Sequence, residues 1–170
     1  MPRMKKILLA AIIVFASAGT ASAGGQPGSI GVGAEFQLSG LGGLSANYDA
    51  GRFHVGGFFG VEDPTGPNNT TIDVGGRFFF HVASTASSDF GVGGSLGIES
   101  THDMAGNSVN DVFIEPSFQI RAFVATNVAL SFTAGISIGA ADAGGLEISG
   151  GSGGLFTTAV TGQAGVHYYF

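Results

Sequence analysis

The chain has 170 residues, a net charge of −6, only 11% charged residues, 31 glycines and no cysteine. The negative charge argues against nucleic acid as a partner, and the absence of cysteine excludes disulfides. Charged residues make up about a quarter of an ordinary soluble domain, so this chain is too poor in charge to present a normal water-facing surface.

The first residues have the pattern of a secretory signal peptide. Three basic residues precede an apolar run from Ile7 to Ala18, and Ala21-Ser22-Ala23 forms a small-x-small cleavage site. The run is shorter than the roughly 20 residues that a membrane-spanning helix needs. We expect cleavage after Ala23, which makes residues 1–23 a signal peptide and residues 24–170 a single exported β-barrel domain.

The exported part would carry only three basic residues, Arg52, Arg77 and Arg121, against all 12 acidic residues, a net charge of −9. A small exported domain without disulfides needs another source of stability. A closed β-barrel in a lipid bilayer supplies one, because every strand is paired with two neighbours.

After the glycine-rich lead, apolar residues recur at every second position, which is the period of a two-sided β-strand. Eight such segments follow one another: Ile30–Leu38, Leu44–Tyr48, Phe53–Val61, Thr71–Val82, Phe90–Glu99, Asp111–Phe123, Val128–Gly139 and Leu155–Phe170. The predicted fold class is therefore all-β.

The connections between these segments alternate in length. Asp49–Arg52, Ala83–Ser88 and Ala125–Asn127 are short, whereas Asp63–Thr70, Thr101–Asn110 and Ala140–Gly154 are longer, with Ser39–Gly43 as a short exception in the second set. Short turns at one end and long loops at the other are typical of an outer-membrane barrel.

Glycine and proline interrupt the strand pattern at defined places. Val55-Gly56-Gly57, Val74-Gly75-Gly76 and Val92-Gly93-Gly94 recur on three successive segments, which we interpret as close packing where a narrow barrel curves. Pro116 lies in the middle of a segment and cannot donate to the ladder, so we expect a β-bulge there.

The two faces of the segments differ in composition. The polar face is small, rich in hydroxyl groups and nearly free of lysine, which suits a crowded lumen, and the apolar face carries no charge. A secreted lipocalin-like carrier, with the apolar residues inside and the polar residues in water, is the alternative.

The last segment ends on Phe170, with Tyr168, Val166, Ala164 and Gly162 at successive steps of two. This ending resembles the C-terminal signal strand of bacterial outer-membrane β-barrels. The resemblance implies that the barrel-assembly machinery reads Val166, Tyr168 and Phe170 during biogenesis.

Length, strand number and this C-terminal pattern together resemble the small barrels of the OmpA transmembrane-domain and OmpX type. The resemblance implies an eight-stranded antiparallel up-and-down transmembrane β-barrel in the outer membrane of a Gram-negative bacterium. It implies lipid as the surrounding partner and a monomeric state, and it speaks for the fold more than for an activity.

Strand alternation places a set of ionisable side chains on the inner face: Glu35, Asp73, Arg77, Glu99, Glu115 and Arg121. An eight-stranded barrel is just wide enough for side chains to fill it. We hypothesise that Arg77 and Arg121 pair with Glu35 and Glu115 in a buried network that closes the lumen. The alternative is a narrow, gated, porin-like channel for ions or small solutes.

Histidines suggest two further sites. His54, His81 and His167 are also expected to face inwards, where a hydrogen-bonded role is favoured over a pH switch or a metal site. His102-Asp103 with Asp111 has the chemistry for a divalent cation, although the spacing is not a defined motif. No cofactor or metal is predicted.

The pattern does not favour an enzyme. No histidine lies on the apolar face, and Gly150–Gly154 reads as a flexible loop tip rather than a strained nucleophile turn. The long loops lack the aromatic and arginine anchors of strong interfaces, so no ligand is identified for them. We therefore expect a non-enzymatic outer-membrane barrel with a structural role or a role in recognition through its outer loops.

Overall fold

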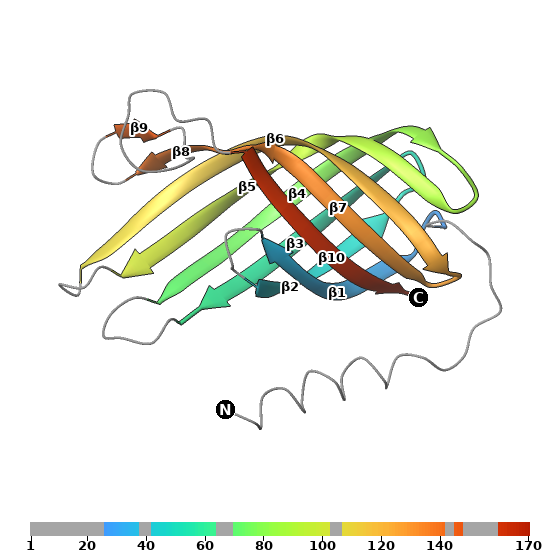
Figure 1. The fold of residues 1–170 in the computed structure, drawn as a ribbon, viewed down its shortest axis with the longest axis horizontal. Helices are drawn as coiled ribbons and strands as arrows, with labels where there is room; N and C mark the ends of the chain where they lie inside the picture. The colour runs from blue at the N-terminus through green and yellow to red at the C-terminus, as the bar shows by residue number, and fades with distance from the viewer. Residues whose placement is uncertain (1–25, 38–41, 64–69, 103–106, 142–144, 148–159) are drawn as a thin grey trace, which may run out of the picture.

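A computed structural model describes residues 26–37, 42–63, 70–102, 107–141, 145–147 and 160–170. Ten strands form in these ranges (Figure 1): β1 Ile30–Gln37, β2 Gly42–Asp49, β3 Phe53–Glu62, β4 Thr71–Ser84, β5 Ser88–His102, β6 Ser108–Ala125, β7 Val128–Ile136, β8 Ile138–Ala141, β9 Gly145–Glu147 and β10 Val160–Tyr169. No helix in the described ranges is long and apolar enough to cross a membrane.

Eight of these strands close into one antiparallel barrel. Neighbours in the sheet follow the order β5-β4-β3-β2-β1-β10-β7-β6, and β5 also pairs with β6, so the ring has no open edge. Each barrel strand pairs with the next barrel strand along the chain, β7 with β10 among them, and β10 returns to β1, where Gly31 lies opposite Tyr169. The prediction of an eight-stranded up-and-down barrel is confirmed.

The two ends of the barrel differ, as the connection lengths predict. At the turn end, which we define by the connections 50–52, 85–87 and 126–127, the strands are joined tightly. The strand ends that flank the longer connections lie at the opposite, loop end, where β8 and β9 also project (Figure 1). The chain finishes at the turn end, where the Tyr169 amide donates to the Asn127 carbonyl at 2.7 Å.

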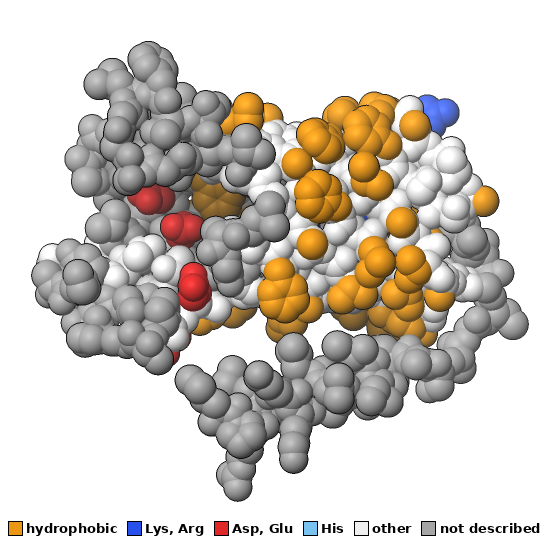
Figure 2. Space-filling model, in the orientation of Figure 1, with side chains coloured by type: hydrophobic (Ala, Val, Ile, Leu, Met, Phe, Trp, Pro, Cys, Tyr) orange, Lys and Arg blue, Asp and Glu red, His pale blue; other side chains and the backbone are white. Residues whose placement is uncertain are grey.

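The outer surface of the barrel is apolar. Large side chains at alternate positions of every long strand are exposed, and they form a broad hydrophobic surface between the two ends (Figure 2). Leu96 in the middle of β5 is 59% exposed. Monomeric soluble proteins rarely expose apolar patches larger than a few hundred Å².

Four of the eight predicted segments are longer at the turn end in the structure, by one or two residues. β4 and β6 run past their predicted ends, Asp49 belongs to β2 rather than to a turn, and β5 begins at Ser88, before its predicted start at Phe90. The start predicted at Leu155 and the expected cleavage after Ala23 lie outside the described residues.

The bulge predicted at Pro116 is wrong. β6 pairs with β5 without a shift at this position, where Gly94 lies opposite Pro116. The irregularity is on the other side, because β7 ends at Ile136 and β8 resumes at Ile138 in the same register along β6. Proline has no backbone N–H to donate to a neighbouring strand. Because the neighbour of β6 is interrupted at Ser137, between β7 and β8, β6 can hold Pro116 without a register shift. Register shifts occur instead at His81/Ala83 and Phe123/Ala125.

The glycine repeat makes space inside the barrel. A Cβ atom on Gly75 would overlap the ring of Phe58 and the Leu96 carbonyl, so a larger residue there would displace that ring. Phe58 on β3 lies opposite Gly75 on β4, and its ring stacks with that of Phe113 at a centroid distance of 6.4 Å. Aromatic rings therefore share the lumen with the polar groups.

Candidate functional site

The middle of the lumen is crossed by a buried ion pair between β4 and β1. Arg77 Nη1 donates to Glu35 Oε1 at 2.7 Å, and Arg77 Nη2 donates to Glu35 Oε2. Gln163 Nε2 on β10 also donates to Glu35 Oε2 at 2.9 Å. Arg77 is 6% exposed and Glu35 3%. Paired hydrogen bonds of this kind fix both position and orientation of the charges.

A serine and a histidine complete this middle layer. Ser45 Oγ lies 2.6 Å from His167 Nε2, and Glu35 Oε1 lies 3.1 Å from the same nitrogen. A hydrolytic Ser-His-acid relay needs the serine and the carboxylate on different ring nitrogens. Because both oxygens meet Nε2, these three side chains form a buried hydrogen-bonded cluster and do not have the relay geometry.

A second ionic layer lies nearer the turn end. Arg121 Nη2 on β6 donates to Asp49 Oδ2 at 2.6 Å and to Asp89 Oδ2 at 2.7 Å. Arg121 Nη1 donates to the Tyr169 hydroxyl at 3.0 Å. The guanidinium carbon also lies 5.5 Å from the centroid of the Phe123 ring. One arginine therefore ties together three other strands across the lumen.

His81 joins this layer as an acceptor. His81 Nδ1 lies 2.8 Å from the Gly51 carbonyl, which can only accept, so this nitrogen carries the proton of the bond. In the tautomer with its proton on Nδ1, Nε2 is the acceptor of the ring, and it lies 2.8 Å from His54 Nδ1 and 3.2 Å from Arg121 Nη2. The two rings extend the Arg121 layer towards β3.

The three groups around Arg121 have the chemistry of a metal site. A ligand atom from each of Asp49, His81 and Asp89 lies within 4.8 Å of the others. Arg121 Nη2 already contacts all three, at 2.6, 3.2 and 2.7 Å. The guanidinium thus takes the position that a metal ion would need, and no metal is assigned there.

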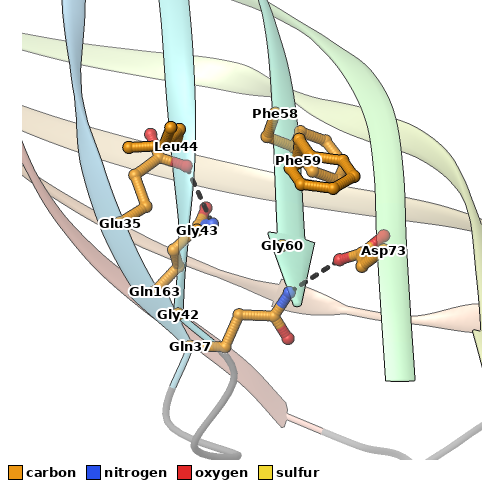
Figure 3. A pocket seen from close by; sticks show the side chains of 10 residues that line it. All are labelled: Glu35, Gln37, Gly42, Gly43, Leu44, Phe58, Phe59, Gly60, Asp73 and Gln163. Atoms are coloured by element: carbon orange, nitrogen blue, oxygen red, sulfur yellow. Dashed lines mark hydrogen bonds between the residues drawn. The ribbon is translucent and has the colours of Figure 1, made fainter. Parts of the chain in front are cut away.

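The loop-end half of the lumen is acidic, and none of its carboxylates pairs with an arginine in the part of the chain that the structure describes. Asp73 Oδ2 accepts from Gln37 Nε2 at 2.9 Å, whereas Glu99 and Glu115 are half-buried. Two small cavities lie here, of about 10 and 30 Å³. Figure 3 shows the first of them, with Asp73 and Gln37 at its edge.

The structure brings together part of the expected network. Glu35 and Arg77 meet, whereas the hypothesis that an arginine pairs with Glu115 is wrong, because Arg121 binds Asp49 and Asp89 instead. The two ionic layers lie at different heights of the barrel.

His102 Nε2 lies 3.0 Å from Ser108 Oγ, and Asp103, its expected partner in a cation site, lies outside the described residues.

Sequence reasoning missed two acids that the Arg121 layer depends on. Asp49 continues the inward parity of Ser45 and Asn47, and it is fully buried. Asp89 has the same parity as the buried Gly91 on β5. Asp49 was assigned to a turn, and Asp89 was left between the turn Ala83–Ser88 and the segment Phe90–Glu99, so extending the alternation by one residue would have found both.

Comparisons with known proteins bear on the fold. No family model matches the sequence, and no curated protein matches it. Among solved structures, the N-terminal β-barrel domain of Pseudomonas aeruginosa OprF is similar, with a TM-score of 0.59 and 12% identity. The match covers 85% of this chain and 98% of that domain. The chain therefore has the fold of the small OmpA-like β-barrels.

Proposed function

We propose that this protein is a monomeric, non-enzymatic barrel of the bacterial outer membrane whose lumen is closed by two ionic layers. Its role is structural, or it recognises partners through the connections at the loop end. The likeness to the OprF barrel domain supports the fold on which this proposal rests.

The observation that carries the proposal is the distribution of side chains between the two faces. Apolar residues cover the outside, while Glu35, Asp49, Arg77 and Arg121 are at least nine-tenths buried inside. A lipid bilayer is the solvent that suits this arrangement, since charged groups on the outer face are costly there. A lipocalin-like carrier needs the opposite distribution, so the structure gives the carrier alternative no support.

Cell fractionation and gel mobility test the proposal together. The protein is expected in the outer-membrane fraction, and it should migrate differently before and after boiling in detergent. Recovery as a soluble protein without detergent, with no heat-dependent shift, would contradict the membrane assignment. It would not contradict the barrel fold.

A narrow channel is the second candidate, favoured by the 30 Å³ cavity beside the Arg77 layer. Conductance of the refolded barrel in a planar bilayer decides between the two. In a closed barrel, Arg77→Ala and the exposed control Arg52→Ala both conduct no more than the wild type. In a gated channel, Arg77→Ala raises the open conductance and Arg52→Ala does not.

A further inference from the structure

The loop-end half of the lumen has an excess of negative charge that the protein itself does not neutralise. Five carboxylates face inwards there by strand alternation: Glu62, Asp73, Glu99, Asp111 and Glu115. After Lys6 the sequence has only three lysines or arginines, Arg52, Arg77 and Arg121. Arg77 pairs with Glu35, Arg121 lies in the other layer, and Arg52 is exposed at the turn end.

The strand register sets three of these acids side by side. Asp73 on β4 lies opposite Glu99 on β5, and Glu99 lies opposite Asp111 on β6. Like charges directly opposite one another in a sheet are destabilising unless something neutralises them. Outside the described residues, lysine and arginine occur only within the first six residues, which belong to the expected signal peptide. A cation from solution would relieve the repulsion.

A buried oxygen without a partner marks where such a cation would sit. Asp73 is 2% exposed, and its Oδ1 atom has no hydrogen-bond partner among the described residues, while Oδ2 accepts from Gln37 (Figure 3). Leaving a buried acceptor unsatisfied costs about 1–3 kcal/mol, and more for a charged group. Asp73 lines the 30 Å³ cavity together with Glu115 on β6.

The other polar groups around this cavity are oxygen-bearing as well. Ser95 and Gln163 line it, and Ser95 is the cross-strand neighbour of Glu115. The volume admits roughly two waters, at about 10–15 Å³ each. It therefore has room for a cation that keeps part of its hydration. Carboxylate, hydroxyl and amide oxygens are the donors of hard cations, and Ca²⁺ tolerates irregular arrangements of them better than Mg²⁺ does.

We propose that the lumen binds a divalent cation, Ca²⁺, between Asp73 and Glu115, with Glu99 and Asp111 drawing cations towards the site from the loop end. This site goes beyond the proposed function. It depends on the closed barrel but not on membrane placement or conduction, so either idea can fail without the other.

The test is isothermal titration of the refolded barrel in non-ionic detergent with CaCl₂, at constant ionic strength. We expect one saturable site with a Kd of about 10⁻⁴–10⁻³ M, the range of weak Ca²⁺ modules. Asp73→Asn and Glu115→Gln should each weaken binding at least tenfold. Asp63→Asn is the matched control, because Asp63 is an exposed acid at the same end, and this variant should bind as the wild type does.

Two results would overturn the proposal. One is that CaCl₂ gives no saturable heat of binding to the wild type and raises its unfolding temperature no more than NaCl of equal ionic strength does. The other is a loss of binding in Asp63→Asn equal to that in Asp73→Asn, which would mean diffuse screening by surface charge. Heat-dependent gel mobility checks that each variant is folded. If Asp73→Asn does not refold, Glu115→Gln and the wild-type titration decide.

Discussion

Arg77 and Glu35 face each other across the lumen through two parallel hydrogen bonds, although their strands, β4 and β1, are separated in the sheet by β2 and β3. The pair fastens one side of the barrel to a strand that it does not neighbour. It also places both charges where water has little access, since Arg77 is 6% exposed and Glu35 3%. The stability of the barrel should therefore be sensitive to either partner.

Arg77→Met should lower the free energy of unfolding by about 3–5 kcal/mol, because it leaves Glu35 charged, buried and without its cation. The double variant Glu35→Leu with Arg77→Met should recover a large part of that loss. Urea unfolding in detergent or lipid vesicles, with Arg52→Met as the exposed control, measures both effects. Equal stability of Arg77→Met and Arg52→Met would show that the buried pair contributes nothing.

Arg121→Met should convert the second layer into a metal site. Without the guanidinium, Asp49, His81 and Asp89 keep ligand atoms within 4.8 Å of one another, a set that suits Zn²⁺. Zn²⁺ should then raise the unfolding temperature of Arg121→Met and leave that of the wild type unchanged. Arg121→Met with Asp89→Asn is the control. A zinc effect that survives this second substitution would place the ion elsewhere.

Gly75→Ala should destabilise the barrel by about 1–3 kcal/mol, the usual range for overpacking. The added Cβ would overlap the ring of Phe58 and the backbone of β5. Gly57→Ala is the matched control, because its Cβ would point outwards and meet nothing closer than 3.6 Å. Denaturant midpoints of the two variants compare inner and outer glycines directly. Similar midpoints would contradict the packing argument.

Leu96→Arg tests whether lipid surrounds the barrel. In a bilayer, arginine near mid-depth on the outer face should cost about 2–4 kcal/mol. In water the same change would be close to neutral, because Leu96 is 59% exposed. The measurement is reversible unfolding of the protein in lipid vesicles, with Leu96→Ala as the size control. A cost below that of Leu96→Ala would argue for a water-facing surface.

Phe170→Ser should impair assembly in cells more than stability in vitro. Tyr168 and Phe170 stack edge to face with centroids 5.0 Å apart, and Phe170 is 70% exposed on the outer face. Under the proposed outer-membrane location, a residue that contacts so little of its own chain is suited to recognition by the barrel-assembly machinery. Outer-membrane levels should fall while refolding into vesicles stays normal. A parallel loss in both assays would make Phe170 a stability residue.

Much of the fold follows from a single local rule. Alternation by two puts Glu35, Asp73, Arg77 and Arg121 inside, since it requires only that the backbone be extended. The same rule places Leu96 outside. Connection lengths then distinguish the two ends of the barrel. These features need no knowledge of how distant strands meet.

The partners within the lumen could not be predicted in this way. Which acid meets Arg121 depends on the tilt and stagger of strands that close into a ring, and these are properties of the whole barrel. Asp49 and Asp89 also lie at strand ends, where sequence patterns fix boundaries poorly. The bulge predicted at Pro116 is wrong for a related reason. The pairing is interrupted in the neighbouring strands, between β7 and β8, and not in β6 itself.

The pairing of β1 with β10 has a consequence for synthesis. Every other pair in the ring joins barrel strands that follow each other along the chain, with only β8 and β9 between β7 and β10, but β1 gains its second partner only when β10 has been made. Until then β1 and β7 each present an unpaired edge, which can pair with other chains. A chain that stops before Val160 should therefore give an open, association-prone sheet rather than a smaller barrel. Chains truncated at successive points between β7 and β10 should all aggregate, and a chain that includes β10 should not.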